Sequence, residues 1–285
     1  MHPVLIQLGP LKIYSYGVFL GFSCVLGAHL AVYLAQRSGI AAARAWWFTI
    51  TVIVVGILGG RVHDVIVNQR GLSELFALVH AGRTAYGAFL SATIAAVVAS
   101  RVLQVGFWRF ADAAAPTMAL GLSLTRIGCF LAGCDYGVRS DRYGIPFPPG
   151  SPAWDDQLAA GEINLSATET LPVLPVQLLE CLLAAAIFAG LMALWFRRPR
   201  REGDVLLGFF GLYGLVRAGI EQLRGDSGRG ELLGLSTSTT IGLLTALGAA
   251  LLAFLPQLRR LRPEAGPVLD VPPPEPRPAG EAKRT

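Results

Sequence analysis

Seven long apolar blocks constrain the fold of this chain more than any other feature of its sequence. Each block has enough residues to cross most of the roughly 30 Å hydrocarbon core of a bilayer as a helix. The chain is 53% hydrophobic and only 15% charged, which argues against an ordinary soluble domain. We therefore predict an all-α polytopic membrane protein with about seven transmembrane helices, at residues 13–35, 46–67, 85–104, 112–134, 173–196, 205–223 and 235–255.

The distribution of lysine and arginine predicts the orientation of these spans. With the N-terminus outside, 14 of the 24 Lys and Arg residues lie in inner segments, 7 lie in outer segments and 3 lie within spans. Because inner loops are enriched in Lys and Arg, this bias predicts an N-out, C-in topology. Inner loops that face an anionic leaflet also explain the pI near 9.3 better than nucleic-acid binding does, since no basic stripe carries interleaved aromatic residues.

Three segments outside the spans differ from them in composition. Residues 135–172 form a polar insert with Pro and Gly, long enough for a small periplasmic head. Residues 68–84 form a mildly amphipathic outer arm, which is expected to lie along the interface. Residues 262–285 are rich in Pro, Glu and Ala, a composition typical of a disordered cytoplasmic tail. We therefore expect one transmembrane domain, 1–261, followed by this tail.

Three arginines lie inside the predicted spans: Arg61, Arg126 and Arg217. Each costs roughly 2.5 to 3.5 kcal/mol at the centre of a membrane helix, so their presence indicates a function. A guanidinium stays charged and its planar fork matches phosphate oxygens. We therefore predict that a phospholipid head group enters the helical bundle.

The fourth block ends in the sequence Gly121-Leu-Ser-Leu-Thr-Arg-Ile-Gly-Cys-Phe-Leu-Ala-Gly-Cys-Asp-Tyr-Gly137. This stretch resembles the signature of the bacterial prolipoprotein diacylglyceryl transferases, whose usual form is Arg-x-Gly-Asn-Phe-x-Asn-Gly-Glu-x-x-Gly. The matching positions are Arg126, Gly128, Phe130, Gly133 and Gly137. Other stretches resemble the family in order and spacing, at residues 2–10, 14–17, 56–61, 175–180 and 211–224.

The resemblance implies an activity, a location and a set of partners. The activity is transfer of the diacylglyceryl group from phosphatidylglycerol to the lipobox cysteine thiol of a preprolipoprotein, which forms a thioether and releases glycerol phosphate. The implied location is the bacterial inner membrane, where the chain is multi-pass. The implied partners are phosphatidylglycerol, preprolipoprotein signal peptides with a lipobox cysteine, and membrane lipids. No cofactor, metal or nucleic acid is implied.

Such a reaction needs fixed cations at the leaving phosphate and a base for a thiol with a pKa of about 8.5. We expect Arg126 and Arg217 to hold the phosphate, with Arg61 as a third cation. Arg217, Glu221 and Arg224 lie at i, i+4 and i+7, which places them on one helical face. They form either a phosphate clamp oriented by a carboxylate or an ion pair that lets the helix insert.

Two tyrosines and two motif positions complete the expected site. Tyr16, at the start of a Tyr-Gly-x-x-x-Gly stretch, is expected to hydrogen-bond a lipid head group, although an interfacial tyrosine has the same pattern. Tyr86 stands where the family commonly has a histidine, and an unperturbed tyrosine is a poorer base at neutral pH. Tyr86 is therefore either the base or a donor to phosphate. Gly137 is assigned to lipid binding, and Glu180 is a candidate site variant.

Cysteines replace two polar residues of the signature. Cys129 stands at its first Asn and Cys134 at its Glu, while Asp135 lies one position beyond and can supply a carboxylate. The C-x4-C spacing is compatible with a disulfide or a metal pair. Packing as small hydrophobic residues is the expected role of both, as it is of Cys24 and Cys181.

Two other functions are compatible with these features. A catalytically silent family member would bind lipid or lipoprotein signal segments without transfer. An anionic-lipid transporter would use similar buried arginines. Covalent modification of a peptide separates the transferase from both alternatives.

Overall fold

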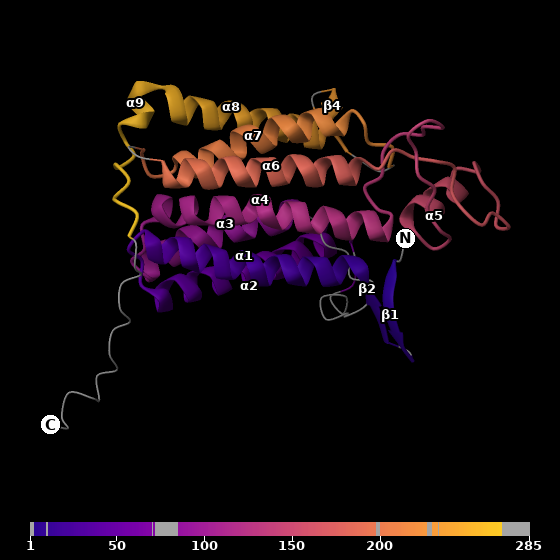
Figure 1. Ribbon diagram of the computed structural model, residues 1–285, viewed down its shortest axis with the longest axis horizontal. Coiled ribbons are helices and arrows are strands. Elements are labelled where there is room, and N and C mark those ends of the chain that lie inside the picture. Colours follow the sequence, from indigo (N-terminus) through magenta and orange to yellow (C-terminus); the bar gives the residue numbers. More distant parts are fainter. Residues whose placement is uncertain are drawn as a thin grey trace. The chain divides into compact units, whose positions relative to one another are not determined.

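The computed structural model describes residues 3–269, except residues 10, 70, 72–84, 198–199, 227–229 and 233. Most of these residues are helical (Figure 1). Five of the described helices are long and apolar enough to cross a membrane: α1 (Ser15–Arg37), α2 (Ala42–Val67), α4 (Phe107–Ala132), α6 (Val176–Phe196) and α8 (Thr237–Phe254). The prediction of a mainly helical membrane protein is confirmed.

Two further helices correspond to the third and sixth predicted blocks. The helix α3 (Ala85–Val102) has 18 residues, of which Gly87–Val102 are described with their side chains and form an apolar helix, and α7 (Asp204–Glu221) carries an arginine and two carboxylates. Neither is among the candidate spans found in the described residues. The count of seven spans and the N-out, C-in orientation therefore stay predictions.

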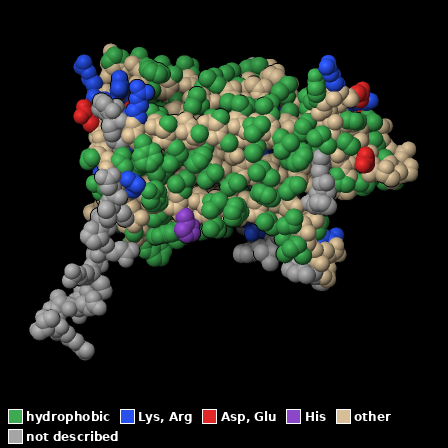
Figure 2. Space-filling view, in the orientation of Figure 1, with side chains coloured by type: hydrophobic (Ala, Val, Ile, Leu, Met, Phe, Trp, Pro, Cys, Tyr) green, Lys and Arg blue, Asp and Glu red, His purple; other side chains and the backbone are tan. Residues whose placement is uncertain are grey.

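Large apolar side chains are exposed along the length of the helices. Figure 2 shows hydrophobic side chains over the helical surface and Lys and Arg mostly near the helix ends. Leu182 of α6 is 68% exposed, and Leu244 and Leu247 of α8 are also exposed. A soluble monomer rarely presents so large an apolar surface, whereas a bilayer covers it at no cost.

The chain divides into two compact units. The first contains Met1–Gly27 and Ala115–Glu264, and the second contains Ala28–Ala114 and Ala265–Thr285. In the second unit α2 packs closely on α3, because glycines face the contact. A Cβ on Gly59 would lie 2.0 Å from Ser91 Oγ, and one on Gly87 would lie 2.2 Å from His63 Cβ. Small residues of this kind let membrane helices approach.

In the first unit, glycines also set the distance between helices. A Cβ on Gly214 of α7 would lie 2.4 Å from the carbonyl oxygen of Gly242 in α8. A Cβ on Gly128 of α4 would lie 2.9 Å from Phe19 Cβ and 3.2 Å from Tyr16 Cα. The signature glycine Gly128 therefore allows the start of α1 to lie directly against the end of α4.

The insert at 135–172 folds around a small core of its own. Tyr136, Phe147, Ala153 and Val173 are buried together, with Phe130 of α4 packed against them. Its one described helix is α5 (Pro152–Ala159), capped by the Ser151 hydroxyl, which accepts a hydrogen bond from Trp154 N.

The insert begins and ends at adjacent points. Gly137 N donates to Leu174 O at 2.8 Å, and Leu174 N donates to Val138 O at 2.9 Å. Isolated bridges also join Arg139 and Ile145 to Val173. The two ends of the insert are therefore fixed to each other.

Four short strands and one short helix were not expected from the apolar pattern. The strands β1 (Val4–Leu8) and β2 (Leu11–Tyr14) form an antiparallel hairpin with Gly9 at positive φ in the turn. The strands β3 (Glu231–Leu232) and β4 (Leu235–Ser236) precede α8, and α9 (Pro256–Arg259) follows it. Most of the predicted outer arm at 68–84, and the predicted tail from residue 270 onward, lie outside the described residues.

Candidate functional site

The end of α4 makes a tight turn that directs an acidic side chain back toward the helix. Gly133 N and Cys134 N both donate to Cys129 O, at 2.8 and 3.2 Å. Gly133 has φ 81° and Asp135 has φ 55°. Positive φ is uncommon for residues other than glycine but is tolerated better by Asp than by most. Because the helix ends at Ala132, the Asp135 carboxylate reaches Arg126.

Arg126 lies at the centre of a buried polar cluster. Its Nη1 donates to Asp135 Oδ2, and its Nε is 3.0 Å from Glu180 Oε2 of α6. The Nε–H is not directed at that oxygen, so this second contact is ionic rather than a well-formed hydrogen bond. The Arg126 and Glu180 side chains are only 13% and 2% exposed. Tyr213 of α7 donates to Glu180 Oε1 at 3.2 Å, which satisfies the other carboxylate oxygen.

A second arginine holds the other oxygen of Asp135. Arg224 Nη2 donates to Asp135 Oδ1 and to Asp226 Oδ2, and Arg224 Nε donates to Asp226 Oδ1 at 2.8 Å. Burial would raise the pKa of Asp135, but the charges of Arg126 and Arg224 outweigh it and lower that pKa to about 2. Burial would likewise lower the pKa of Arg224, but its hydrogen bond to Asp226 and the charge of Asp135 raise it. We refer to Arg126, Asp135, Glu180 and Arg224 as the Arg126 cluster.

A backbone clip places Arg224 beside Asp135. Val138 N donates to Leu223 O at 2.9 Å, and Gly225 N donates to Tyr136 O at 3.0 Å. Gly137 lies in this clip, where a Cβ would be 2.7 Å from both Leu174 Cβ and Val176 Cγ1. A side chain at position 137 would clash with Leu174 and Val176, which explains the glycine there. The clip joins the signature to the end of α7.

Arg217 forms a separate buried pair on α7. Its Nη2 is 2.8 Å from Glu221 Oε2 and donates to Ser238 Oγ at 3.1 Å. The side chains of Arg217 and Glu221 are 15% and 2% exposed. Among the described residues, Arg217 Nη1 is buried and has no hydrogen-bond acceptor. Buried donors are nearly always paired, so this nitrogen indicates a place for an oxygen ligand.

Tyr16 lies next to the signature because Gly128 brings α1 against α4. The Tyr16 hydroxyl interacts electrostatically with Arg126, Cys129 and Asp135. The structure therefore brings together seven of the residues named from the sequence. They are Tyr16, Arg126, Cys129, Cys134, Asp135, Glu180 and Arg224.

The two signature cysteines are free thiols. Cys129 Sγ lies 3.4 Å from Asp135 Oδ2 and accepts from Arg126 Nη1 at 3.7 Å. The ligand atoms of Cys129, Cys134 and Asp135 lie within 4.8 Å of one another, a set that suits a thiophilic metal ion. Each oxygen of Asp135 already accepts from an arginine, so such an ion would have to compete with a guanidinium group for its carboxylate ligand.

Arg61 and Tyr86 belong to the second unit. Arg61 is partly buried on α2, one turn before the buried Asp64, which accepts from Asn68 Nδ2 at 2.8 Å. Tyr86 lies in α3, and its side chain is outside the described part of the chain. Their participation in the site stays a prediction.

Three contacts in the candidate site were not anticipated from the sequence. Tyr213 lies four residues before Arg217, so helical periodicity places it on the same face. Asp226 lies two residues after Arg224, a spacing that gives only a weak signal. Ser238 comes from another helix, and no sequence pattern connects it with Arg217.

Comparison with known proteins finds, over nearly the whole chain, the family that the sequence signature resembles. The family model described as prolipoprotein diacylglyceryl transferase matches residues 3–255. The phosphatidylglycerol–prolipoprotein diacylglyceryl transferase 2 of Clostridium perfringens is 29% identical over 91% of this chain and 97% of its own length. The corresponding transferase of Clostridium tetani is 30% identical over 87% of this chain and 94% of its own length. That of a Nostoc species is 28% identical over 93% of each chain.

Proposed function

This chain belongs to the prolipoprotein diacylglyceryl transferase family, and from this premise we propose that it transfers a diacylglyceryl group from phosphatidylglycerol to the cysteine thiol of a prolipoprotein. The chain covers almost the full length of relatives with that name. The buried arginines of the first unit supply the cations that this chemistry requires.

The topology that we propose has seven spans, N-out and C-in. In it α3 and α7 cross the membrane with the five candidate spans, and the excess of Lys and Arg in the inner segments supports this orientation. The domain 1–261 then lies in the bacterial inner membrane with the insert 135–172 as a periplasmic head, and residues 262–285 form a cytoplasmic tail. The Arg126 cluster lies at the head end, where the lipobox peptide would arrive.

The reaction explains the need for fixed cations. The cysteine sulfur forms a bond to the terminal glycerol carbon of the diacylglyceryl group, and the bond from this carbon to the phosphate oxygen breaks. The leaving group is glycerol phosphate, which carries one more negative charge than the phosphodiester did, while the thiol proton passes to a base. Cations that bind the phosphate more tightly as this charge develops lower the barrier.

The observation that carries the proposal is the buried donor Nη1 of Arg217. Its Nη2 is held by Glu221 and Ser238, which fixes the plane of the guanidinium. A phosphate oxygen at Nη1 would complete the hydrogen bonding of this side chain. We therefore assign Arg217 to the phosphate, together with Arg126.

Asp135 is the carboxylate that a phosphate would displace from Arg126. Its side chain is 30% exposed, whereas those of Glu180 and Glu221 are 2% exposed and cannot move without opening the helix packing. In this proposal Asp135 neutralises Arg126 and Arg224 before lipid arrives, and then leaves Arg126 to the phosphate. Arg224 keeps Asp226 as its partner throughout.

The remaining assignments are part of the same proposal. Tyr16 donates a hydrogen bond to the head group from α1, and Arg61 supplies a further cation. Gly137 keeps the head close to α6, which shapes the lipid site. Tyr86 acts either as the base or as a donor to phosphate.

The test is direct detection of the product. The protein, purified in neutral detergent, is incubated with phosphatidylglycerol and a synthetic lipobox peptide, and the peptide is analysed by mass spectrometry. A diacylglyceryl adduct on the cysteine, with release of glycerol phosphate, is the expected result. Lipid retention without an adduct, while a relative is active in the same assay, would establish a silent lipid-binding protein. Lipid movement without covalent change would establish a transporter.

A further inference from the structure

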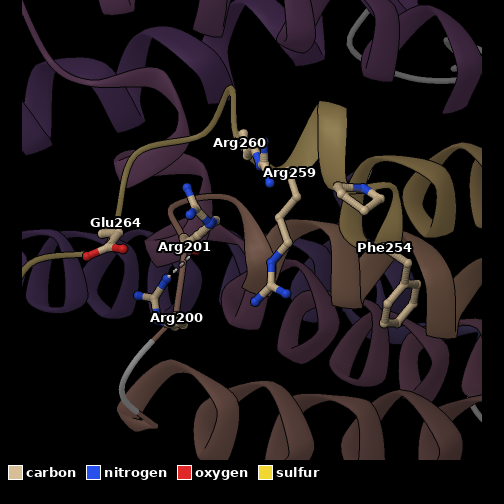
Figure 3. Close-up of a pocket in the computed structure, with 7 residues that line it drawn as sticks. Arg200, Arg201, Phe254, Arg259, Arg260 and Glu264 are labelled. Atoms are coloured by element: carbon tan, nitrogen blue, oxygen red, sulfur yellow. Dashed lines mark hydrogen bonds between the residues drawn. The ribbon is translucent and has the colours of Figure 1, made fainter.

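A basic pocket lies at the opposite end of α6 from the Arg126 cluster. Glu180 and Phe196 are 16 residues apart on this helix, a rise of about 24 Å. The pocket has a volume of about 400 Å³, within the range of small-molecule sites. It is lined by Arg200, Arg201, Arg259, Arg260, Glu264 and Phe254 (Figure 3).

The walls of this pocket are held by buried contacts. Arg262 is 3% exposed and donates to Asp204 Oδ1 at 2.7 Å and to Glu202 O at 3.1 Å. Arg201 Nη1 donates to Arg262 O at 2.7 Å, and Glu202 N donates to Pro263 O at 2.9 Å. The segment after α9 is therefore fixed to the start of α7, and the arginines are displayed on a defined frame.

The charge of the pocket is strongly positive. Four arginines line it and Glu264 is its one carboxylate. Arg259 and Arg260 are exposed and have no ion-pair partner in the described part of the chain. Figure 3 shows Arg201 and Arg259 extending into the space between Glu264 and Phe254. Guanidinium groups gathered in this way favour a phosphate, which accepts from several of them at once.

An apolar surface borders the same pocket. Phe254 is 81% exposed, and the neighbouring Leu261 is also strongly exposed. Phe254 is the last residue of α8, where a candidate span ends, and Leu261 comes seven residues later. A soluble phosphate would use the arginines but would leave this surface in water. A lipid uses both, because its phosphate lies at the interface and its acyl chains cover the apolar side chains.

We propose that this pocket binds the phosphate head group of an anionic phospholipid, as a second lipid site separate from the Arg126 cluster. The site holds an intact lipid and does not take part in the transfer reaction. It fixes the end of α8 and the start of α7 at the membrane interface.

The experiment compares Arg259→Gln/Arg260→Gln with the wild type by counting bound phosphatidylglycerol in native mass spectrometry from neutral detergent. Each surface arginine near an anionic lipid contributes about a fivefold gain in affinity, so the double variant should bind the pocket lipid about thirtyfold more weakly. Arg44→Gln/Arg101→Gln is the control, because it removes the same charge from two exposed arginines outside the pocket. Phosphatidylcholine and free glycerol phosphate are tested at the same concentrations.

The expected result is loss of one bound phosphatidylglycerol in the pocket variant only, with no binding of the other two compounds there. Equal lipid retention in the pocket variant and the wild type would overturn the proposal. Equal loss in both variants would also overturn it, because bulk charge would then explain the binding. Full occupancy by free glycerol phosphate would replace the lipid by a soluble ligand. None of these readouts depends on transfer activity.

Discussion

The most informative perturbation removes the charge of Arg217 without leaving a buried charge behind. Changing Arg217 alone would strand Glu221, which is 2% exposed, and removing one partner of a buried pair costs about 3 to 5 kcal/mol of stability. The double variant Arg217→Gln/Glu221→Gln replaces both charges by neutral amides, so no uncompensated buried charge is left behind. It therefore separates the chemical role of Arg217 from its role in folding.

The expected loss of activity follows from the contacts of Arg217. Its Nη1 has no acceptor among the described residues, so the proposed phosphate is its remaining partner. Removing one fixed donor to a developing anion typically lowers kcat about 100- to 1,000-fold. Glu221→Gln alone keeps the arginine and should retain most of the activity per folded molecule, although it leaves a buried cation and lowers stability. Arg139→Gln, at an exposed position of the head, serves as the charge control.

The assay measures the rate of adduct formation on the lipobox peptide, together with the thermal unfolding midpoint of each variant in detergent. We expect a double variant that unfolds near the wild-type midpoint but transfers at least 100-fold more slowly, from the donor loss given above. A well-folded double variant with activity within threefold of the wild type would refute the phosphate assignment of Arg217. Equal losses in Glu221→Gln would show that the pair acts through its structure.

Three further predictions concern the signature and its contacts. Asp135 has a folded pKa of about 2 against an ordinary 3.8, so its contribution to stability is complete above about pH 4 and is lost as the pH falls toward 2. In Asp135→Asn the unfolding midpoint should therefore depend less on pH between about pH 4 and pH 2 than in the wild type. The same pH dependence in both proteins would contradict the ion pairs of Asp135. Gly128→Ala should destabilise the protein by about 1 to 3 kcal/mol, because the new Cβ would meet Phe19. Gly190→Ala is the control, because a Cβ at position 190 would lie in open space. Chemical denaturation in detergent measures the stability of both variants. Tyr213→Phe leaves one Glu180 oxygen without its donor and should cost about 1 to 3 kcal/mol by the same measurement; no change would mean that the hydroxyl is dispensable.

The helices could be predicted from the sequence because the length of an apolar stretch is read directly from consecutive residues. The predicted block 205–223 corresponds to α7 at Asp204–Glu221, and 235–255 corresponds to α8 at Thr237–Phe254. The sequence also predicts that α3 and α7 are spans; this stays a prediction, because neither is among the five candidate spans of the described residues. The β1–β2 hairpin was missed because its strands are short and adjoin the first apolar block.

The candidate site was predicted in part. The contacts that were missed join residues far apart in the sequence. Arg126 and Asp135 lie nine residues apart, so the signature alone indicated both. Their meeting required the helix to end at Ala132, which depends on Gly133. The pairing of Arg126 with Glu180, and that of Asp135 with Arg224, 89 residues away, comes from helix packing and the backbone clip. No local pattern encodes those contacts.

The closed ends of the insert have a consequence for how this protein can vary. Because Arg139 and Val173 are bridged, the chain leaves the helical bundle and returns to it at nearly one point. Residues between them can be lengthened, shortened or exchanged at small entropic cost, since loop closure depends only weakly on loop length. The turn before Asp135 limits this freedom, because Ala153 N donates to Gly133 O at 3.2 Å and a replacement must keep that contact. The part of the insert that lies away from Gly133 is thus free to differ in length and sequence while its two ends stay joined.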